Sequence, residues 1–263
     1  MKKILWMAVF LTVFFVFLPH ASRADSLATE TSSPETINNS CDITAGDIAI
    51  IQNIQSDPSL NSIDKIKQEL AARKDLLIKT IQCAQNNALQ LQEQLNNNTM
   101  IDPGLLSIKN QLSDGLSGAV SYYNIQIQNV SNSGILGTKL IARNILAWRE
   151  NNYVPLADNV VNFIAWSNNQ TLFTTASDRM TQIGGLVGSP LFSENTDLQK
   201  DYQEAVVSLN AAEAQNSNAK NAFSQSLPSD QTLSYIQQSL ALLSETYQHF
   251  FDISTIIQSL IPH

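Results

Sequence analysis

Two segments near the C-terminus repeat apolar residues at alternating intervals of three and four, and this repeat constrains the fold more than any other feature. The first stripe consists of Leu198, Tyr202, Ala205, Leu209, Ala212, Asn216, Ala219 and Phe223, with Asn216 as its one polar member. The second stripe consists of Leu233, Ile236, Leu240, Leu243, Tyr247, Phe250, Ser254, Ile257 and Ile261. Such heptad spacing places each set on one face of an α-helix and predicts coiled-coil packing. Because the connection is short and contains Pro228, we expect two antiparallel neighbours.

Two earlier segments carry similar stripes and are expected to form further long helices. One stripe, with Arg73 at its single polar position, runs through Ile63, Ile66, Leu70, Leu77, Ile81, Ala84, Ala88, Leu91 and Leu95. The other runs through Leu105, Ile108, Leu112, Leu116, Ala119, Tyr123, Ile127 and Val130. Before them, Thr44 is a candidate N-cap of a short helix that ends at Asp57 and Pro58. Asparagine-rich breaks are expected at residues 96–98 and 132–134.

The remaining segments complete an all-α pattern. We predict a third helix from Ile135 to Trp166, a fourth from Thr171 to Ile183, and an interruption at GGLVGSP, residues 184–190. Convincing period-two alternation, which would indicate β-strands, is absent from the sequence. The predicted fold is therefore an elongated antiparallel helical bundle with long heptad-patterned helices, in one domain over residues 41–263.

The N-terminus has the layout of a secretory signal peptide. Lys2 and Lys3 precede an apolar run from Ile4 to Leu18, and small residues flank Arg23 before a cleavage site expected after Ala24. Residues 25–40 are polar and are expected to form a flexible segment. The alternative is a retained membrane anchor, but the run is shorter than the roughly 20 residues that a spanning helix needs. We therefore expect export to the periplasm, cell surface or medium, without a stable membrane span after cleavage.

The charge of the chain argues against nucleic acid as a partner. The sequence has 15 basic and 23 acidic residues, and its net charge is −8. Cleavage would remove Lys2, Lys3 and Arg23 and lower the net charge to −11. Such a chain repels phosphate backbones and anionic lipid unless a local basic patch forms.

Two cysteines, Cys41 and Cys83, remain after cleavage. In an oxidising compartment, an even pair predicts one disulfide, and closing this loop would stabilise the fold by on the order of 4 kcal/mol. The alternative is two separate buried thiols. The absence of a CxxC motif argues against a redox or metal role.

The segment LAWRENNYVPLADNVVNFIAW, residues 146–166, is the candidate binding region. Pro155 inside a helical pattern predicts a kink or restart near Tyr153. A cleft there would expose Trp148, Arg149 and Tyr153 as an aromatic and cationic patch for a peptide, glycan or carboxylate. The alternative, which the helical spacing favours, is a bundle waist in which Trp148 packs inward and Arg149 pairs with an acidic neighbour.

The sequence lacks the motifs of most enzyme chemistries. Glycine-rich GGLVGSP has no phosphate-binding spacing, and no nucleophile elbow is present. His249 has Glu245 one turn away, which suits an ordinary ion pair. We expect no catalytic residues, no metal ligands and no cofactor.

These observations lead to two functional hypotheses. The first is an exported, non-enzymatic structural or interaction protein whose partner is a protein of the envelope or of a surface assembly. The second is a ligand- or peptide-binding module that uses a cleft near Pro155. An enzyme with carboxylates that meet only in the fold is the weakest alternative.

Overall fold

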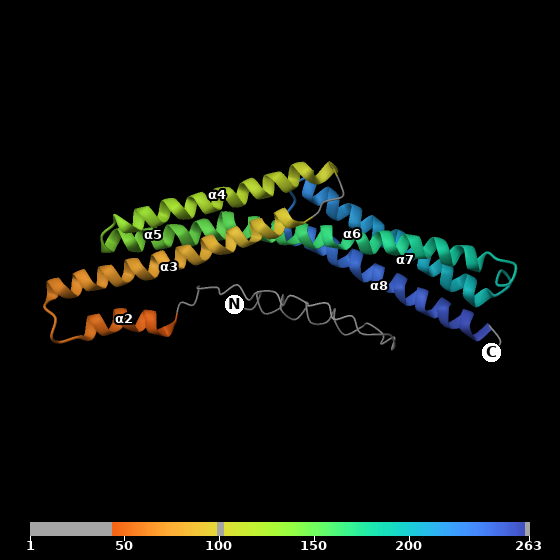
Figure 1. Cartoon of the computed structure of the whole chain (residues 1–263), viewed down its shortest axis with the longest axis horizontal. Coiled ribbons are helices and arrows are strands. Elements are labelled where there is room, and N and C mark those ends of the chain that lie inside the picture. Colours follow the sequence, from red (N-terminus) through yellow and green to blue (C-terminus); the bar gives the residue numbers. More distant parts are fainter. Residues whose placement is uncertain (1–43, 99–102, 261–263) are drawn as a thin grey trace, which may run out of the picture. The chain divides into compact units, whose positions relative to one another are not determined.

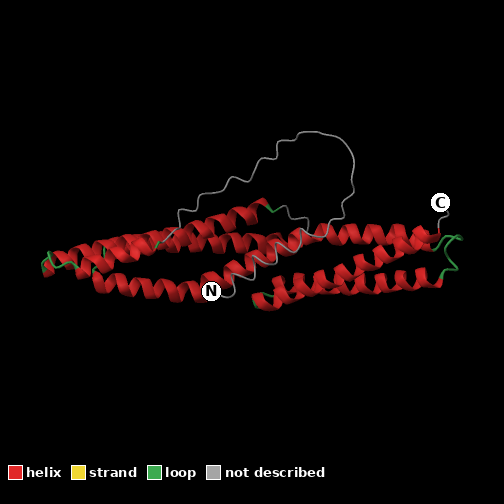
Figure 2. Ribbon diagram, turned by 90° about the horizontal axis from the view of Figure 1, so that it is seen from below, coloured by secondary structure: helices red, strands yellow, loops and turns green. Residues whose placement is uncertain are grey.

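A computed structural model describes residues 44–98 and 103–260 of the chain, and Figures 1 and 2 show its arrangement. Every regular element in these two ranges is helical, which confirms the predicted all-α helical bundle. The predicted signal peptide and flexible segment lie outside the described residues. The elements are α2 (Ala45–Ser56), α3 (Ser62–Asn97), the 3₁₀ turn η1 (Pro103–Leu105), α4 (Leu106–Ser131), α5 (Ile135–Trp148), the π turn η2 (Arg149–Tyr153), α6 (Val154–Val187), α7 (Thr196–Ser224) and α8 (Ser229–Leu260).

Side-chain caps fix the starts of three helices. Thr44 and Asp47 form a reciprocal capping box at the start of α2, as the sequence predicted for Thr44. Asn61 accepts a hydrogen bond from the backbone N–H of Asp64 at the start of α3, and Asn195 accepts one from Leu198 in α7. Each cap satisfies a backbone N–H that has no partner inside the helix, so these starts follow directly from local sequence.

The helices pack in two groups. Helices α3, α4 and α5 contact one another, and α6, α7 and α8 do the same, while α6 also contacts α3 and α4 (Figure 1). The largest core lies between the helices of the first group and also includes the adjoining ends of α6, α7 and α8. Two smaller cores continue along α6, α7 and α8. The predicted stripe of α3 is buried only in its C-terminal half, where Ile81 and Leu95 are covered, whereas Ile63 and Ile66 stay exposed.

Helices α7 and α8 are antiparallel neighbours, as predicted, and small residues line their contact. The buried residues of α7 recur every seven positions at Leu198, Ala205, Ala212 and Ala219. Those of α8 recur every seven positions at Thr232, Ser239, Thr246 and Ile253. In an antiparallel pair these two series face each other level by level, and Leu198 and Ile253 do share one core at the end of the pair. The small side chains allow the two backbones to approach closely.

The residues that α8 buries agree with the predicted stripe at some positions and differ from it at others. Ile236, Leu243 and Phe250 are buried as predicted, but Leu233 and Ser254 are exposed. Ser239 and Thr246 are buried instead, and their hydroxyls donate to the backbone carbonyls of Ile236 and Leu242. Because each hydroxyl is satisfied within its own helix, a small polar residue is tolerated at the closest approach to α7.

The predicted break between Trp166 and Thr171 is wrong, because α6 runs through it without interruption. The polar residues that suggested a loop bond to neighbouring helices instead. The Ser167 hydroxyl donates to the side-chain oxygen of Asn98 at 2.6 Å, and the Asn98 amide donates to Asn168 at 2.9 Å. The Gln170 amide reaches back to the carbonyl of Trp166.

The GGLVGSP segment begins its interruption later than predicted. Helix α6 includes Gly184 and Gly185 and ends only at Val187, which is buried. A Cβ at Gly184 would lie 2.5 Å from the hydroxyl oxygen of Tyr202 on α7. Alanine at this position would require the Tyr202 side chain to shift, so glycine here favours the close approach of α7 and does not make a turn.

No helix among the described residues is long and apolar enough to cross a membrane.

Candidate functional site

The predicted patch of Trp148, Arg149 and Tyr153 lies where α5 meets α6, and its aromatic side chains pack against α4. The Trp148 ring stacks on Tyr122, with centroids 3.9 Å apart and an interplanar angle of 15°. Tyr123 meets the edges of both Trp148 and Tyr153 at 5.6 and 5.9 Å. The Arg149 guanidinium lies 5.7 Å from the centre of the Tyr153 ring. The three predicted residues are thus brought together, mainly by contacts with one another and with α4.

Pro155 explains the local backbone of this region. Proline has no N–H to donate to the preceding turn, so the helix cannot close a regular turn there. The chain widens into the π turn η2 instead, in which the N–H of Val154 donates to the carbonyl of Arg149, five residues earlier. The side-chain amides of Asn151 and Asn152 donate to the carbonyls of Ala147 and Trp148. The predicted kink or restart is therefore a continuous helix with one π turn.

Tyr123 is the most buried member of the aromatic group. Its side chain is fully covered, and its hydroxyl has no hydrogen-bond partner among the described residues. Burial raises the pKa of Tyr123 to about 12, although the nearby Arg149 charge lowers it in part. Burial also raises the pKa of Tyr153. Tyr123 and Tyr153 are therefore core residues, whereas Trp148 and Arg149 are half-buried beside them.

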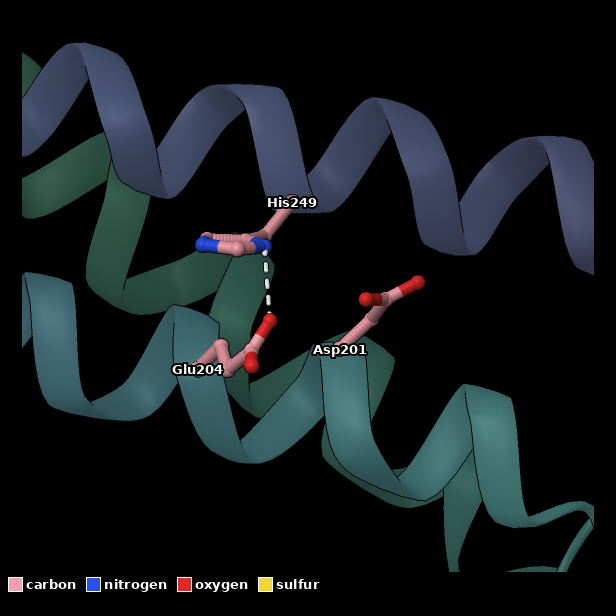
Figure 3. A group of neighbouring side chains, drawn as sticks. All are labelled: Asp201, Glu204 and His249. Carbon is pink, nitrogen blue, oxygen red and sulfur yellow. Dashed lines mark ion pairs between the residues drawn. The ribbon is translucent and has the colours of Figure 1, made fainter.

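A second group of titratable side chains lies between α7 and α8. Glu204 projects from α7 toward His249 on α8, and Asp201 projects from α7 beside them, as Figure 3 shows. One ligand atom from each of the three residues lies within 4.8 Å of the other two. The His249 Nδ1 atom is 3.9 Å from a carboxylate oxygen of Glu204. The carboxylate that contacts His249 is therefore that of Glu204 across the helix interface, whereas the sequence suggested Glu245 on its own helix.

Sequence reasoning missed this cluster because its members come from two helices. Asp201 and Glu204 are three residues apart, so they share one face of α7, but His249 follows much later in the chain. Only the register of the two heptad stripes brings His249 opposite them. Pairing the stripes level by level from the short connection outward would have found this juxtaposition.

One face of α5 carries exposed apolar side chains. Leu136, Leu140 and Leu146 keep 83%, 58% and 60% of their surface exposed. Lys139 and Arg143 lie exposed between them, and the sequence of α5 contains no acidic residue. The opposite face packs on α3 and α4 through Ile141 and Ile145. The solvent-facing side of α5 is therefore partly apolar and carries only positive charge.

Cys41, one of the two cysteines of the predicted disulfide, lies outside the described residues. Cys83 is half-buried on α3. Nearby, the Lys79 ammonium contacts both carboxylate oxygens of Asp47 on α2 at 3.2 Å. This contact fixes the level at which the start of α2 lies beside α3.

No family model, curated protein or solved structure matches this chain.

Proposed function

We propose that the chain is an exported, non-enzymatic interaction protein whose α5 surface docks an acidic amphipathic helix of an envelope protein. The observation that carries this proposal is the exposed leucine row on α5 with Lys139 and Arg143 set within it. Large apolar side chains clustered on one exposed face are typical of protein-interaction surfaces. A helix that lays its apolar face on such a row is anchored at intervals of three, four and seven residues.

Charge selects the kind of partner. The chain as a whole is acidic, with a net charge of −8, yet α5 is purely basic. Carboxylates that flank the apolar stripe of a partner helix would pair with Lys139 and Arg143 and guide the approach. The acidic remainder of the chain disfavours an extended anionic membrane or nucleic acid, which would meet repulsion beyond α5.

Export is supported by the layout of residues 1–24, with its basic start, apolar run and small residues before the expected cleavage site. A disulfide between Cys41 and Cys83 belongs to the same proposal, since such bonds persist in oxidising compartments. The helix register favours this pairing. Helices α2 and α3 run antiparallel, because Asp47 contacts Lys79 while Gln55, later in α2, donates to Glu69, earlier in α3. Cys83 lies one turn beyond Lys79, at the level from which the chain enters α2.

Two synthetic amphipathic peptides test the docking proposal. Both carry leucines on one face, but one has glutamates and the other lysines beside that face. We expect the glutamate peptide to bind the purified chain and the lysine peptide to bind much more weakly. Charge reversal at Lys139 and Arg143 should weaken glutamate-peptide binding at least about tenfold, and added salt should weaken binding to the unmodified chain. Leu140→Ser should weaken glutamate-peptide binding as well, whereas its matched control Leu191→Ser, at an exposed leucine outside α5, should not.

A site-specific photocrosslinker at Leu140, used in the envelope of the native cell, extends the test to the natural partner. The proposal expects the crosslinked peptide to be an amphipathic helix with acidic flanks. Equal binding of both synthetic peptides, or no effect of charge reversal, would contradict it. Binding of anionic vesicles in preference to the glutamate peptide would indicate a lipid surface instead.

A further inference from the structure

We propose that Asp201, Glu204 and His249 form a binding site for a first-row divalent cation and that Zn²⁺ is the ion that fits it best. The bound ion would link α7 to α8. The three ligand atoms already lie within 4.8 Å of one another (Figure 3). Bonds of about 2.0–2.2 Å to a tetrahedral Zn²⁺ would bring such atoms to about 3.4 Å apart. A small inward movement of side chains is therefore enough to complete the site.

The Glu204 side chain is free to make part of this movement. Glu204 keeps 45% of its side chain exposed, so it can change rotamer without disturbing the core. Asp201 and Glu204 share one face of α7 because they are three residues apart. His249 reaches them from the neighbouring helix, so the bound ion would bridge two helices. Carboxylates and histidines that project from facing helices are a recurring way to build metal sites in bundles.

The imidazole of His249 supplies the second observation. Its side chain keeps only 23% exposure, and its Nδ1 atom is buried without a hydrogen-bond partner among the described residues. The nearest carboxylate oxygen, on Glu204 at 3.9 Å, is too far away for a hydrogen bond. A buried ring nitrogen of this kind normally has a partner. A cation between Nδ1 and the two carboxylates would be that partner.

The donor set selects the class of ion. One imidazole nitrogen and two carboxylate oxygens suit Zn²⁺ and related first-row cations, whereas Mg²⁺ and Ca²⁺ prefer oxygen ligands alone. The two carboxylates balance the double positive charge, and a water completes four-coordination. The Lys200 ammonium, 3.8 Å from a Glu204 oxygen, would compete with the cation, but its side chain is 71% exposed and free to leave.

Calorimetric titration of the purified full chain with zinc chloride tests the proposal. We expect one saturable site per chain and no comparable binding of magnesium chloride. His249→Gln and Glu204→Gln should each weaken zinc binding at least about tenfold, since loss of even an outer-shell partner of a metal ligand weakens binding 10- to 100-fold. Glu213→Gln changes another exposed carboxylate of α7, and His263→Gln removes the C-terminal imidazole. Both controls should bind zinc like the unmodified chain.

A second readout guards against variants that fold poorly. Because the ion would bind only the folded chain, saturating zinc should raise the melting temperature of the unmodified protein and of both controls. The melting temperature of His249→Gln, with native helicity in circular dichroism, should not respond. The proposal is wrong if the unmodified chain shows no saturable zinc binding, if His249→Gln and Glu204→Gln bind as tightly as Glu213→Gln, or if His263→Gln loses the binding.

Discussion

Gln170 on α6 and Asn216 on α7 donate hydrogen bonds to each other across the helix interface. The Asn216 amide donates to the Gln170 side-chain oxygen at 3.0 Å, and the Gln170 amide returns a bond to Asn216 at 3.2 Å. The Trp166 ring N–H also donates to the backbone carbonyl of Asn216 at 3.3 Å. Asn216 is the one polar member of the predicted α7 stripe, so this reciprocal pair explains its position and ties α6 to α7 in one register.

Removing either side of this pair should destabilise the bundle. Gln170→Ala leaves the half-buried amide of Asn216 without its partner, and we expect a loss of about 1–2 kcal/mol in the free energy of unfolding. Asn216→Ala should cost a similar amount, and the double variant less than the two losses combined. Urea denaturation measures all three. Strict additivity would show that the two amides do not interact.

Gly184 and Gly185 should respond differently to alanine although they are adjacent. At Gly185 a Cβ meets nothing within 4 Å, so alanine should stabilise α6 by up to about 1 kcal/mol. At Gly184 the Cβ meets the Tyr202 hydroxyl, so the same gain should be cancelled or reversed. Thermal unfolding of the two variants tests this contrast. Tyr202→Phe in the Gly184→Ala background should recover part of the loss, and equal stability of the two alanine variants would contradict the close approach.

Tyr123 makes stability depend on alkaline pH. The pKa of Tyr123 is about 12 in the fold, whereas that of an unfolded tyrosine is about 10. As the pH rises from 10 to 12, the unfolded chain loses this proton first, so the free energy of unfolding falls by on the order of 2 kcal/mol. The pKa of Tyr153 is raised as well, which adds a loss in the same direction.

Tyr123→Phe should remove the part of this alkaline loss that belongs to Tyr123. At neutral pH the variant should be as stable as the unmodified chain or more stable, because the hydroxyl lacks a partner among the described residues. Denaturation at several pH values measures both effects. Destabilisation by more than about 1 kcal/mol at neutral pH would show that the hydroxyl is hydrogen-bonded after all.

The proposed disulfide between Cys41 and Cys83 has a direct mass signature. Protein recovered from an oxidising compartment should resist thiol alkylation until it is reduced, and proteolysis should yield one linked peptide that contains both cysteines. Reduction should lower the free energy of unfolding by on the order of 4 kcal/mol if the loop-entropy account holds. Alkylation of both thiols without prior reduction would refute the pairing.

The sequence predicted the helices where their boundaries depend on local chemistry. Thr44, Asn132 and the start at Ile135 mark helix ends because caps and breaks act within a few residues. The prediction from sequence failed where a helix boundary depends on contacts with residues far along the chain. The polar run after Trp166 stays helical because Asn98 and other residues far along the chain satisfy it, and Gly184 lies within α6, where Tyr202 of α7 approaches it closely.

The candidate sites, too, were predicted where they depend on spacing along one helix and missed where they depend on contacts between helices. Spacing along one helix brought Trp148, Arg149 and Tyr153 together, but only the structure shows that Tyr122 and Tyr123 occupy their inner faces. The cluster around His249 was missed because its carboxylates lie on another helix. The exposed leucines of α5 were equally hidden, since periodicity indicates that a helix has an apolar face but not which faces remain uncovered.

The packing of the two seams and the proposed metal site both depend on the register of α7 against α8. This register sets the small residues of the two helices opposite one another and brings His249 close to Asp201 and Glu204. Paired cysteines test it most directly, in a chain whose own Cys41 and Cys83 are replaced by serine. Ala212→Cys with Ser239→Cys should form a disulfide rapidly under mild oxidation, since these positions face each other. Ala212→Cys with Thr246→Cys, displaced by about 10 Å along α8, should not. Crosslinking of the displaced pair, or of neither, would contradict this register.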